Sequence, residues 1–306
     1  MLGPVIETLI GGLLTGILYS LVALGFVLIF KASGVFNFAQ GAMVLFAALS
    51  LARLSEFMPF FLAFGLSIAI MIALAYAIEF LVLRHLVNQE GIILFMATLG
   101  VTYFLDGFGQ TVWGSDIYKI DLGWPKEPIF IFENLFPGGI LIDQTEVIAA
   151  VICAVLVAVL AVFFQVTRVG RALRAVADDH QAAQSVGIPL NQIWLMVWAV
   201  AGVVALVAGM IWGAKLGVQF SISLVALKAL PVLILGGFTS IPGAIVGGLI
   251  IGAGEKLAEV LLSPVLIRWF DLAGGGIENW FAYVLALLFL LVRPQGLFGE
   301  RIIERI

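Results

Sequence analysis

The chain has 306 residues, of which 63% are hydrophobic and only 11% are charged. A soluble globular domain has about 25% charged residues, so this composition places the chain in a lipid bilayer. The net charge of −4, with no basic run and no zinc-ligand spacing, argues against a nucleic-acid-binding protein.

The chain contains eight apolar segments that suit membrane crossing, since a helix needs roughly 20 apolar residues to cross the hydrocarbon. All are expected to be helices, because a helix satisfies its own backbone hydrogen bonds in lipid. They predict an all-α polytopic membrane protein, with one transmembrane domain over residues 1–306. Three acids close to segment ends, Glu7, Glu79 and Glu255, are expected at the membrane interface. The segments are about 6–30, 37–54, 59–83, 92–112, 146–166, 193–214, 225–254 and 279–293.

Polar residues interrupt the apolar pattern around the second segment and within the fourth. In "KASGVFNFAQGAM" (31–43), Asn37 and Gln40 are three apart and share a face if this part is helical. Such residues either bond one helix to another or line a substrate path, and both alternatives stay open. The path candidates are Asn37, Gln40, Thr98 and Thr102. The last two begin a stripe that recurs every fourth residue: Thr98, Thr102, Asp106 and Gln110.

A polar stretch, "GRALRAVADDHQAAQSVGI" (170–188), lies between the fifth and sixth segments. It is rich in helix formers, Gly187 is a typical helix end, and Arg174 and Asp178 are spaced to pair on one turn. Such a helix is too polar to span and marginal alone, so it needs a docking partner. Because loops rich in Lys and Arg stay inside, 167–192 is predicted to be cytoplasmic and 113–145 extracytoplasmic.

The seventh segment is broken by "LGGFTSIPGA" (235–244), and the break is predicted at Gly236, Gly237, Pro242 and Gly243. One alternative is a re-entrant loop, which keeps the C-terminal arginines, Arg301 and Arg305, in the cytoplasm. The other alternative is that the segment crosses the membrane once. The break itself is expected to form either a packed core or pathway wall, or a close-packed helix crossing, because glycines let backbones approach.

Catalytic motifs are missing from the sequence. There is no Walker pattern, HExxH, GxSxG or Cys/His cluster, so no catalytic site, cofactor or metal is predicted. Cys153 is expected to be a buried apolar residue, and His85 and His180 to be surface residues.

Four stretches resemble one family, the membrane permeases of Liv-type branched-chain amino acid ABC importers, and among these the H-type permease. They are "GILYSLVALGFVLIFKASGVFNFAQGAM", "GRALRAVADDHQAAQSVGI", "ALKALPVLILGGFTSIPGAIVGGLIIG" and "RPQGLFG". The resemblance implies that 171–187 is a coupling helix docking on a cytoplasmic ATPase, with Gly187 setting its end. The charges expected to pair with the ATPase are Arg171, Arg174, Asp178 and Asp179.

The resemblance also implies partners: a second, related permease, two ATPase subunits and a periplasmic binding protein, besides membrane lipid. One position departs from the family, since Ala42 follows Gly41 where many members carry an acid, and this leaves the substrate open. A urea or short-amide importer is therefore an alternative. A secondary transporter is less expected because few charges lie in the segments, and a passive channel would need no coupling helix.

Overall fold

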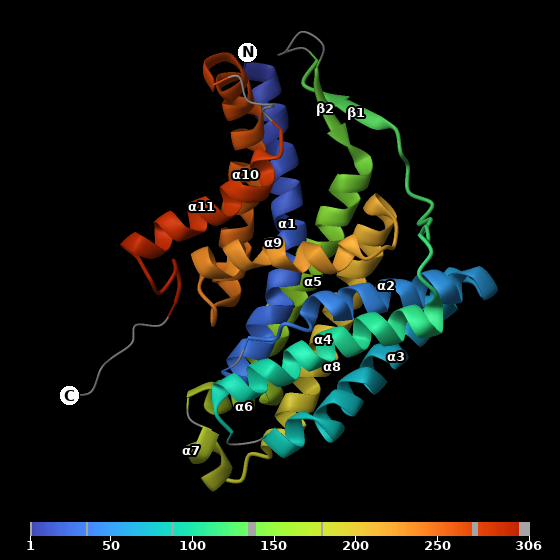
Figure 1. The fold of residues 1–306 in the computed structure, drawn as a ribbon, viewed down its shortest axis with the longest axis vertical. Helices are drawn as coiled ribbons and strands as arrows, with labels where there is room; N and C mark the ends of the chain where they lie inside the picture. The colour runs from blue at the N-terminus through green and yellow to red at the C-terminus, as the bar shows by residue number, and fades with distance from the viewer. Residues whose placement is uncertain are drawn as a thin grey trace. The chain divides into compact units, whose positions relative to one another are not determined.

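The computed structural model describes residues 2–34, 36–86, 89–133, 139–178, 180–270 and 275–299. In these ranges the chain is almost entirely helical (Figure 1). The helices are α1 (Leu2–Ser33), α2 (Gln40–Phe57), α3 (Phe60–Leu81), the 3₁₀ turn η1 (Leu83–Leu86), α4 (Gly91–Trp113), α5 (Gln144–Val166), α6 (Arg168–Asp178), α7 (His180–Ser185), α8 (Leu190–Leu216), α9 (Ser221–Gly236), α10 (Ile241–Phe270) and α11 (Ile277–Val292).

All eight predicted apolar segments are helical, which confirms the all-α membrane class. Five helices in the described residues are long and apolar enough to span, namely α1, α3, α4, α5 and α8, and the bent pair of α9 and α10 would make a sixth. α11 is apolar but short, with 16 residues. α10 continues beyond the predicted end of the seventh segment at 254, to Phe270, and the first charged residues of this extension, Glu255 and Lys256, form ion pairs.

The chain packs as two compact units, each made of separate stretches of sequence. Unit 1 comprises Met1–Ala23, Gly123–Val155 and Lys228–Ile306, and unit 2 comprises Leu24–Leu122 and Leu156–Leu227. Three helices are divided between the units, with one part of each helix in unit 1 and the other part in unit 2: α1, α5 and α9.

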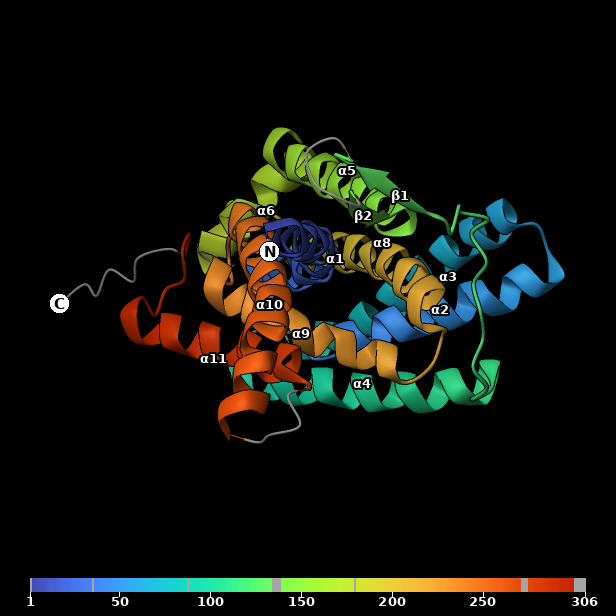
Figure 2. The same cartoon turned by 90° about the horizontal axis from the view of Figure 1, so that it is seen from above.

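Unit 2 is built around α2, in which every residue from Gln40 to Ala52 is buried. α2 packs against α3, α4 and α8, and α2 and α4 run side by side in Figures 1 and 2. Glycines make the closest approach possible, since a Cβ at Gly209 would lie 2.5 Å from the carbonyl oxygen of Val44. The unit therefore owes its tight core to small residues on α8 facing the buried helix.

Unit 1 is held by a similar glycine contact between α1 and α10. A Cβ at Gly12 would lie 2.7 Å from the carbonyl oxygen of Gly252, and one at Gly16 would overlap the backbone at Gly248. Gly248 and Gly252, two small residues four positions apart, thus pack directly on α1, as small-xxx-small pairs do.

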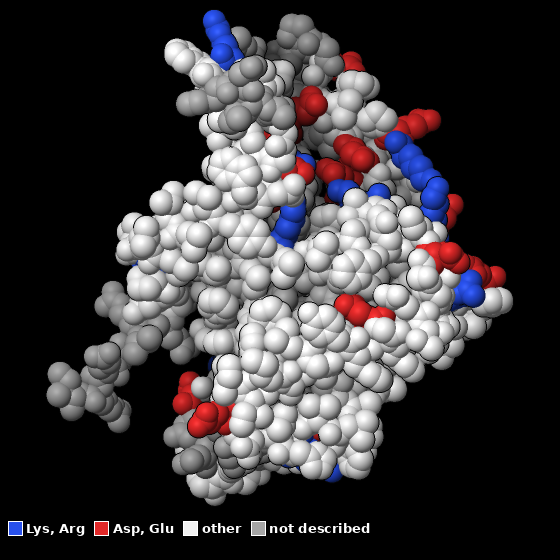
Figure 3. All heavy atoms as spheres, in the orientation of Figure 1, with Lys and Arg blue, Asp and Glu red and all other residues white. Residues whose placement is uncertain are grey.

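The predicted extracytoplasmic loop folds in part as a hairpin, which the sequence pattern did not predict. β1 (Pro128–Ile131) pairs antiparallel with β2 (Ile140–Asp143), with Pro128 opposite Asp143. Figure 3 shows white over most of the visible face, with red and blue side chains in scattered groups.

Candidate functional site

The segment just before α2 carries the first group of predicted path residues. Asn37 is fully buried, and its Oδ1 accepts a hydrogen bond from the backbone N–H of Ala39 at 3.0 Å. The next N–H, that of Phe38, donates to Oγ1 of Thr98 on α4 at 3.3 Å. The structure therefore brings Asn37 and Thr98, 61 positions apart in the sequence, into one polar cluster of unit 2.

Aromatic rings surround this cluster, which was not anticipated from the sequence. Phe26 stacks on Phe36 with centroids 4.7 Å apart, and Phe38 meets both Phe36 and Phe95 edge to face at 4.9 Å. Such ring contacts fix the segment against α1 and α4.

Gln40 begins α2 and is completely buried. Neither its amide oxygen nor its amide nitrogen has a hydrogen-bond partner among the described residues. Its side chain lies against Gly25, where an added Cβ would overlap the amide. The predicted shared helical face with Asn37 does not form, because the helix starts only at Gln40 and Asn37 lies in the preceding turn.

The rest of the polar stripe on α4 separates from this cluster. The hydroxyl of Thr102 donates to the carbonyl of Thr98, one turn earlier on its own helix, at 2.8 Å. Gln110 is exposed and lines a small cavity of about 170 Å³ together with residues that include Asp116 and Phe220. The stripe is therefore regular in sequence, but its residues contact different parts of unit 2 along α4.

The predicted coupling segment is described as two helices, α6 and α7, and Asp179 between them lies outside the described residues. α6 packs against α8, with Leu173 and Val176 buried. The guanidinium of Arg174 donates to the carbonyl of Phe164 at 2.7 Å, and that of Arg171 donates to the carbonyl of Val166 at 3.0 Å.

Both arginines thus occupy the last carbonyls of α5, where cations stabilise a helix end. Asp178 is exposed at the end of α6. Gly187 has φ +85°, and the N–H of Ile188 bonds to the carbonyl of Ala183 at 3.0 Å, so the chain turns after α7 at the predicted glycine. α6 is thereby bonded to the end of α5, and both α6 and α7 contact α8.

The predicted break lies between α9 and α10, whose axes differ by 114°. Gly237 has φ +105°, a conformation open to glycine, and Gly236 and Gly243 meet backbone to backbone. Oγ of Ser240 accepts the N–H of Gly243 at 3.0 Å, as an N-cap does, and Pro242 lies in the first turn of α10.

The segment after α11 completes the break. The N–H groups of Leu297 and Phe298 donate to the carbonyls of Leu235 and Gly236 at 2.8 and 3.1 Å. The motif "RPQGLFG" therefore supplies partners to the last carbonyls of α9, which would otherwise be unpaired at a helix end inside the protein. This link between two distant motifs could not be read from either one.

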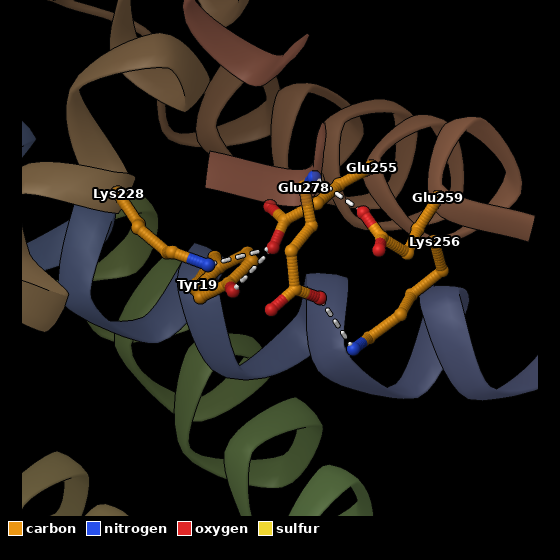
Figure 4. A network of polar contacts seen from close by, with 6 residues as sticks. All are labelled: Tyr19, Lys228, Glu255, Lys256, Glu259 and Glu278. Carbon is orange, nitrogen blue, oxygen red and sulfur yellow. Dashed lines mark hydrogen bonds and ion pairs between the residues drawn. The ribbon is translucent and has the colours of Figure 1, made fainter. Parts of the chain in front are cut away.

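A network of charged side chains in unit 1 was missed at the sequence level (Figure 4). Nζ of Lys228 on α9 lies 2.8 Å from Oε1 of Glu255 on α10, and the hydroxyl of Tyr19 on α1 donates to the same oxygen at 3.1 Å. Beside it, Nζ of Lys256 lies 2.8 Å from Oε2 of Glu278, whose N–H donates to Glu259 at 3.0 Å. A lysine at position 228, inside a predicted span, was the available signal.

Glu255 and Glu79, which were predicted at the membrane interface, are buried inside the protein. Each is only 1% exposed, and each has a cationic neighbour, Lys228 for Glu255 and Arg84, at 3.5 Å, for Glu79. Glu7 lies in a cavity and accepts the N–H of Leu141 at 3.2 Å. Burial is possible because a cationic partner offsets part of the cost of removing a carboxylate from water.

The cavity beside this network has a volume of about 310 Å³ and lies within unit 1. Charged and apolar side chains share its wall. It is lined by Glu7, Thr8, Ile10, Gly11, Leu14 and Thr15 of α1, Leu141, Ile142, Asp143 and Glu146 near the start of α5, and Lys256 and Val260 of α10. Its size is at the lower end of the roughly 300–1,000 Å³ that small-molecule sites occupy.

Comparison with known proteins identifies the family to which this chain belongs. Residues 8–293 match the family model described as "Branched-chain amino acid transport system / permease component". The high-affinity branched-chain amino acid transport system permease protein BraD of Pseudomonas aeruginosa is 28% identical, with 98% of each chain covered. LivH of Escherichia coli K12 is also 28% identical, over 98% of this chain and 97% of that protein.

Among solved structures, the one described as PsaBC from Streptococcus pneumoniae in complex with Fab is similar at a TM-score of 0.48 and 17% identity, over 97% of this chain and 98% of that chain. The family match covers nearly all the apolar helices and includes both the segment between α5 and α8 and the break between α9 and α10. Members of this family are multi-pass transport subunits of the inner membrane and leave ATP hydrolysis to a separate subunit. The chain belongs to the permease components of branched-chain amino acid transport systems.

Proposed function

We propose that this chain is a permease subunit of an ATP-driven importer that moves branched-chain or related amino acids across the inner membrane by alternating access. It works with a second, related permease, two cytoplasmic ATPase subunits and a periplasmic binding protein. The observation that carries this proposal is the α6–α7 segment, a polar helical connection held between two long apolar helices.

The geometry of that segment supports a role in transmitting force. Buried Leu173 and Val176 and the bonds from Arg171 and Arg174 fasten α6 to unit 2, so a push on its exposed face moves the helices behind it. An exposed carboxylate, Asp178, is available to a basic groove on a partner. Asp179 completes this predicted docking set, with Gly187 ending it.

Within unit 2, the substrate path is proposed to pass Asn37, Gln40, Thr98 and Thr102. Polar groups buried in an apolar protein are costly and commonly mark a route for a polar cargo. The unpaired amide of Gln40 supports this best, because a passing substrate or water would satisfy it. The break at Gly236, Gly237, Pro242 and Gly243, which lies in unit 1, is proposed separately to line a pathway. Alternating access then requires two packings with unequal affinity for the nucleotide-bound ATPase.

The proposal is tested by reconstituting the purified complex with its binding protein and ATP in proteoliposomes. We expect ATP-dependent uptake of leucine, isoleucine or valine and stimulation of ATPase activity by the loaded binding protein. Uptake of urea or acetamide instead of these amino acids would show that the proposed cargo is wrong. Uptake without ATP would show that the protein is not part of an ATP-driven importer.

The coupling role is tested with two variants of the same segment. Asp178→Asn is expected to reduce stimulated ATPase activity severalfold while leaving the thermal unfolding midpoint unchanged, since the side chain is exposed. Arg174→Gln is expected to lower the midpoint, because it removes the bonds to α5. Normal stimulation in Asp178→Asn would remove this residue from the docking surface.

A further inference from the structure

Lys228 and Glu255 form an ion pair within unit 1, and the side chain of Glu255 is only 1% exposed. With Tyr19, these residues lie near the middle of α9, α10 and α1. Ionisable groups within membrane helices are rare, and when present they tend to mark substrate or ion pathways. A pair that only held α9 to α10 could be replaced by apolar residues with little loss of stability, so packing alone is a weak reason for it.

The pairing is also incomplete. Oε1 of Glu255 receives both bonds, from Lys228 and from Tyr19, while Oε2 is buried and has no partner among the described residues. Lys228 is 26% exposed, and an ammonium group has three N–H donors. The pair therefore places a negatively charged acceptor, the carboxylate of Glu255, beside positively charged donors, the ammonium group of Lys228.

This arrangement is complementary to one kind of molecule, a zwitterion with neighbouring ammonium and carboxylate groups. An ammonium group can donate to the open oxygen of Glu255, and a carboxylate can accept from Lys228. Because the ligand is neutral overall, its binding adds no net charge to a low-dielectric site, whereas the binding of a simple cation or anion would.

The neighbouring cavity is lined by Lys256, the cation of the adjacent ion pair, and not by Lys228 or Glu255 themselves. Thr15, which lines the cavity, lies one helical turn before Tyr19, and Lys256, which also lines it, follows Glu255 directly. Figure 4 shows the Glu278 side chain between the two lysines, so charges of alternating sign continue from the cavity to the pair. The cavity wall includes Ile10, Leu14 and Val260, which suit an apolar side chain.

We propose that Lys228 and Glu255 bind the charged head of an α-amino acid, the carboxylate on Lys228 and the ammonium on Glu255, with the cavity beside Lys256 as the approach. The inference goes beyond the path proposed in unit 2 and rests on the proposed function for the identity of the cargo. Tyr19 acts as a positioning residue, because its hydroxyl holds Oε1 and leaves Oε2 to the ligand.

The test is a charge-specific cycle on the full chain, co-purified with its partner subunits in nanodiscs and without the binding protein. The probes are leucine, leucinamide, which lacks the carboxylate, and 4-methylpentanoate, which lacks the ammonium. We expect wild type to bind leucine about tenfold or more tightly than either analogue, the value of one charge-assisted hydrogen bond. Glu255→Gln should lose the preference over 4-methylpentanoate only, and Lys228→Met the preference over leucinamide only.

Two further variants keep the test decisive. Glu127→Gln, an exposed acid of unit 1, is the matched control and should bind as wild type does. The double variant Lys228→Met/Glu255→Gln leaves neither charge unpaired, so it should fold and lose both preferences. If the pair is purely structural, the substitutions should change the unfolding midpoint but not the ratios of the affinities for leucine and its two analogues.

The two hypotheses fail differently. Equal affinities of wild type for all three probes, or unchanged ratios in the variants, would overturn the site even where leucine uptake by the reconstituted importer is normal. Absence of leucine uptake with intact discrimination among the probes would overturn the proposed function and leave the site standing.

Discussion

Gln40 illustrates at the residue scale how stability and transport can be separated. Its buried amide has no partner among the described residues, and such a group costs about 1–3 kcal/mol. Gln40→Met removes that cost at similar volume, so the thermal unfolding midpoint is expected to stay or rise. Uptake in proteoliposomes is expected to fall severalfold, because the path loses a polar contact. Gln192→Met, an exposed position in the same unit, is the control, and normal uptake by Gln40→Met would remove this residue from the path.

Two adjacent glycines of α1 give a second residue-scale prediction with opposite signs. An added Cβ at Gly12 would lie 2.7 Å from a backbone oxygen of α10, whereas nothing lies within 4 Å of one at Gly11. Gly12→Ala is therefore expected to destabilise the protein by about 1–3 kcal/mol through overpacking. Gly11→Ala is expected to be neutral or to stabilise by up to about 1 kcal/mol, because alanine favours the helix.

Thermal unfolding of the two purified variants checks this pair. Both carry the same chemical change one position apart, so expression, detergent and helix propensity are matched. Equal midpoints would mean that α1 and α10 are not in backbone contact at Gly12 and Gly252.

At the scale of elements, the break between α9 and α10 depends on a segment far along the chain. Leu297 and Phe298 supply the bonds to the last carbonyls of α9. A chain ending after Val292 is therefore expected to lose about 1–3 kcal/mol for each buried carbonyl left unpaired, and to unfold at a lower temperature. A chain ending after Gly299 keeps both bonds and should behave as the full chain does. Identical midpoints for the two truncations would show that the bonds do not hold the bend.

Elements were predictable where one physical signal dominates. Hydrophobic length located all eight helical segments, and the glycines and proline of 235–244 located the bend, because both effects are local in sequence. The end of α10 was placed 16 residues too early, since charge along one sequence says nothing of partners on other helices. Lys228 and Glu255 meet across the bend, and Leu297 reaches Leu235 across 62 positions.

The candidate site was predictable only as a set of residue types. Asn37 and Thr98 do meet, but through the backbone of Phe38 rather than through a helical face with Gln40. Arg174 was expected to pair with Asp178, whereas in the structure its guanidinium donates to the carbonyls of Phe164 and Gln165 at the end of α5. Spacing rules apply within one helix, and here the decisive partners come from a turn or from the next helix.

At the scale of the whole molecule, the arrangement across the membrane remains a prediction from the basic residues. Lys31 and Arg84 are expected on the same side as α6 and α7, and the hairpin of β1 and β2 on the other. The side of the membrane on which the C-terminus lies depends on the 114° bend. A re-entrant pair of α9 and α10 returns the chain to the side it came from, whereas a single crossing does not.

Single-cysteine labelling in intact cells tests this topology, after Cys153, which is buried, is replaced by alanine. Lys126→Cys, on the exposed approach to β1, is expected to react with a membrane-impermeant maleimide from outside. Asp178→Cys is expected to react only after lysis, and so is a cysteine added after Ile306 if α9 and α10 are re-entrant. A terminal cysteine labelled in intact cells, with Asp178→Cys still protected, would establish a single crossing, and then the bend is a packing device rather than a turn within the membrane.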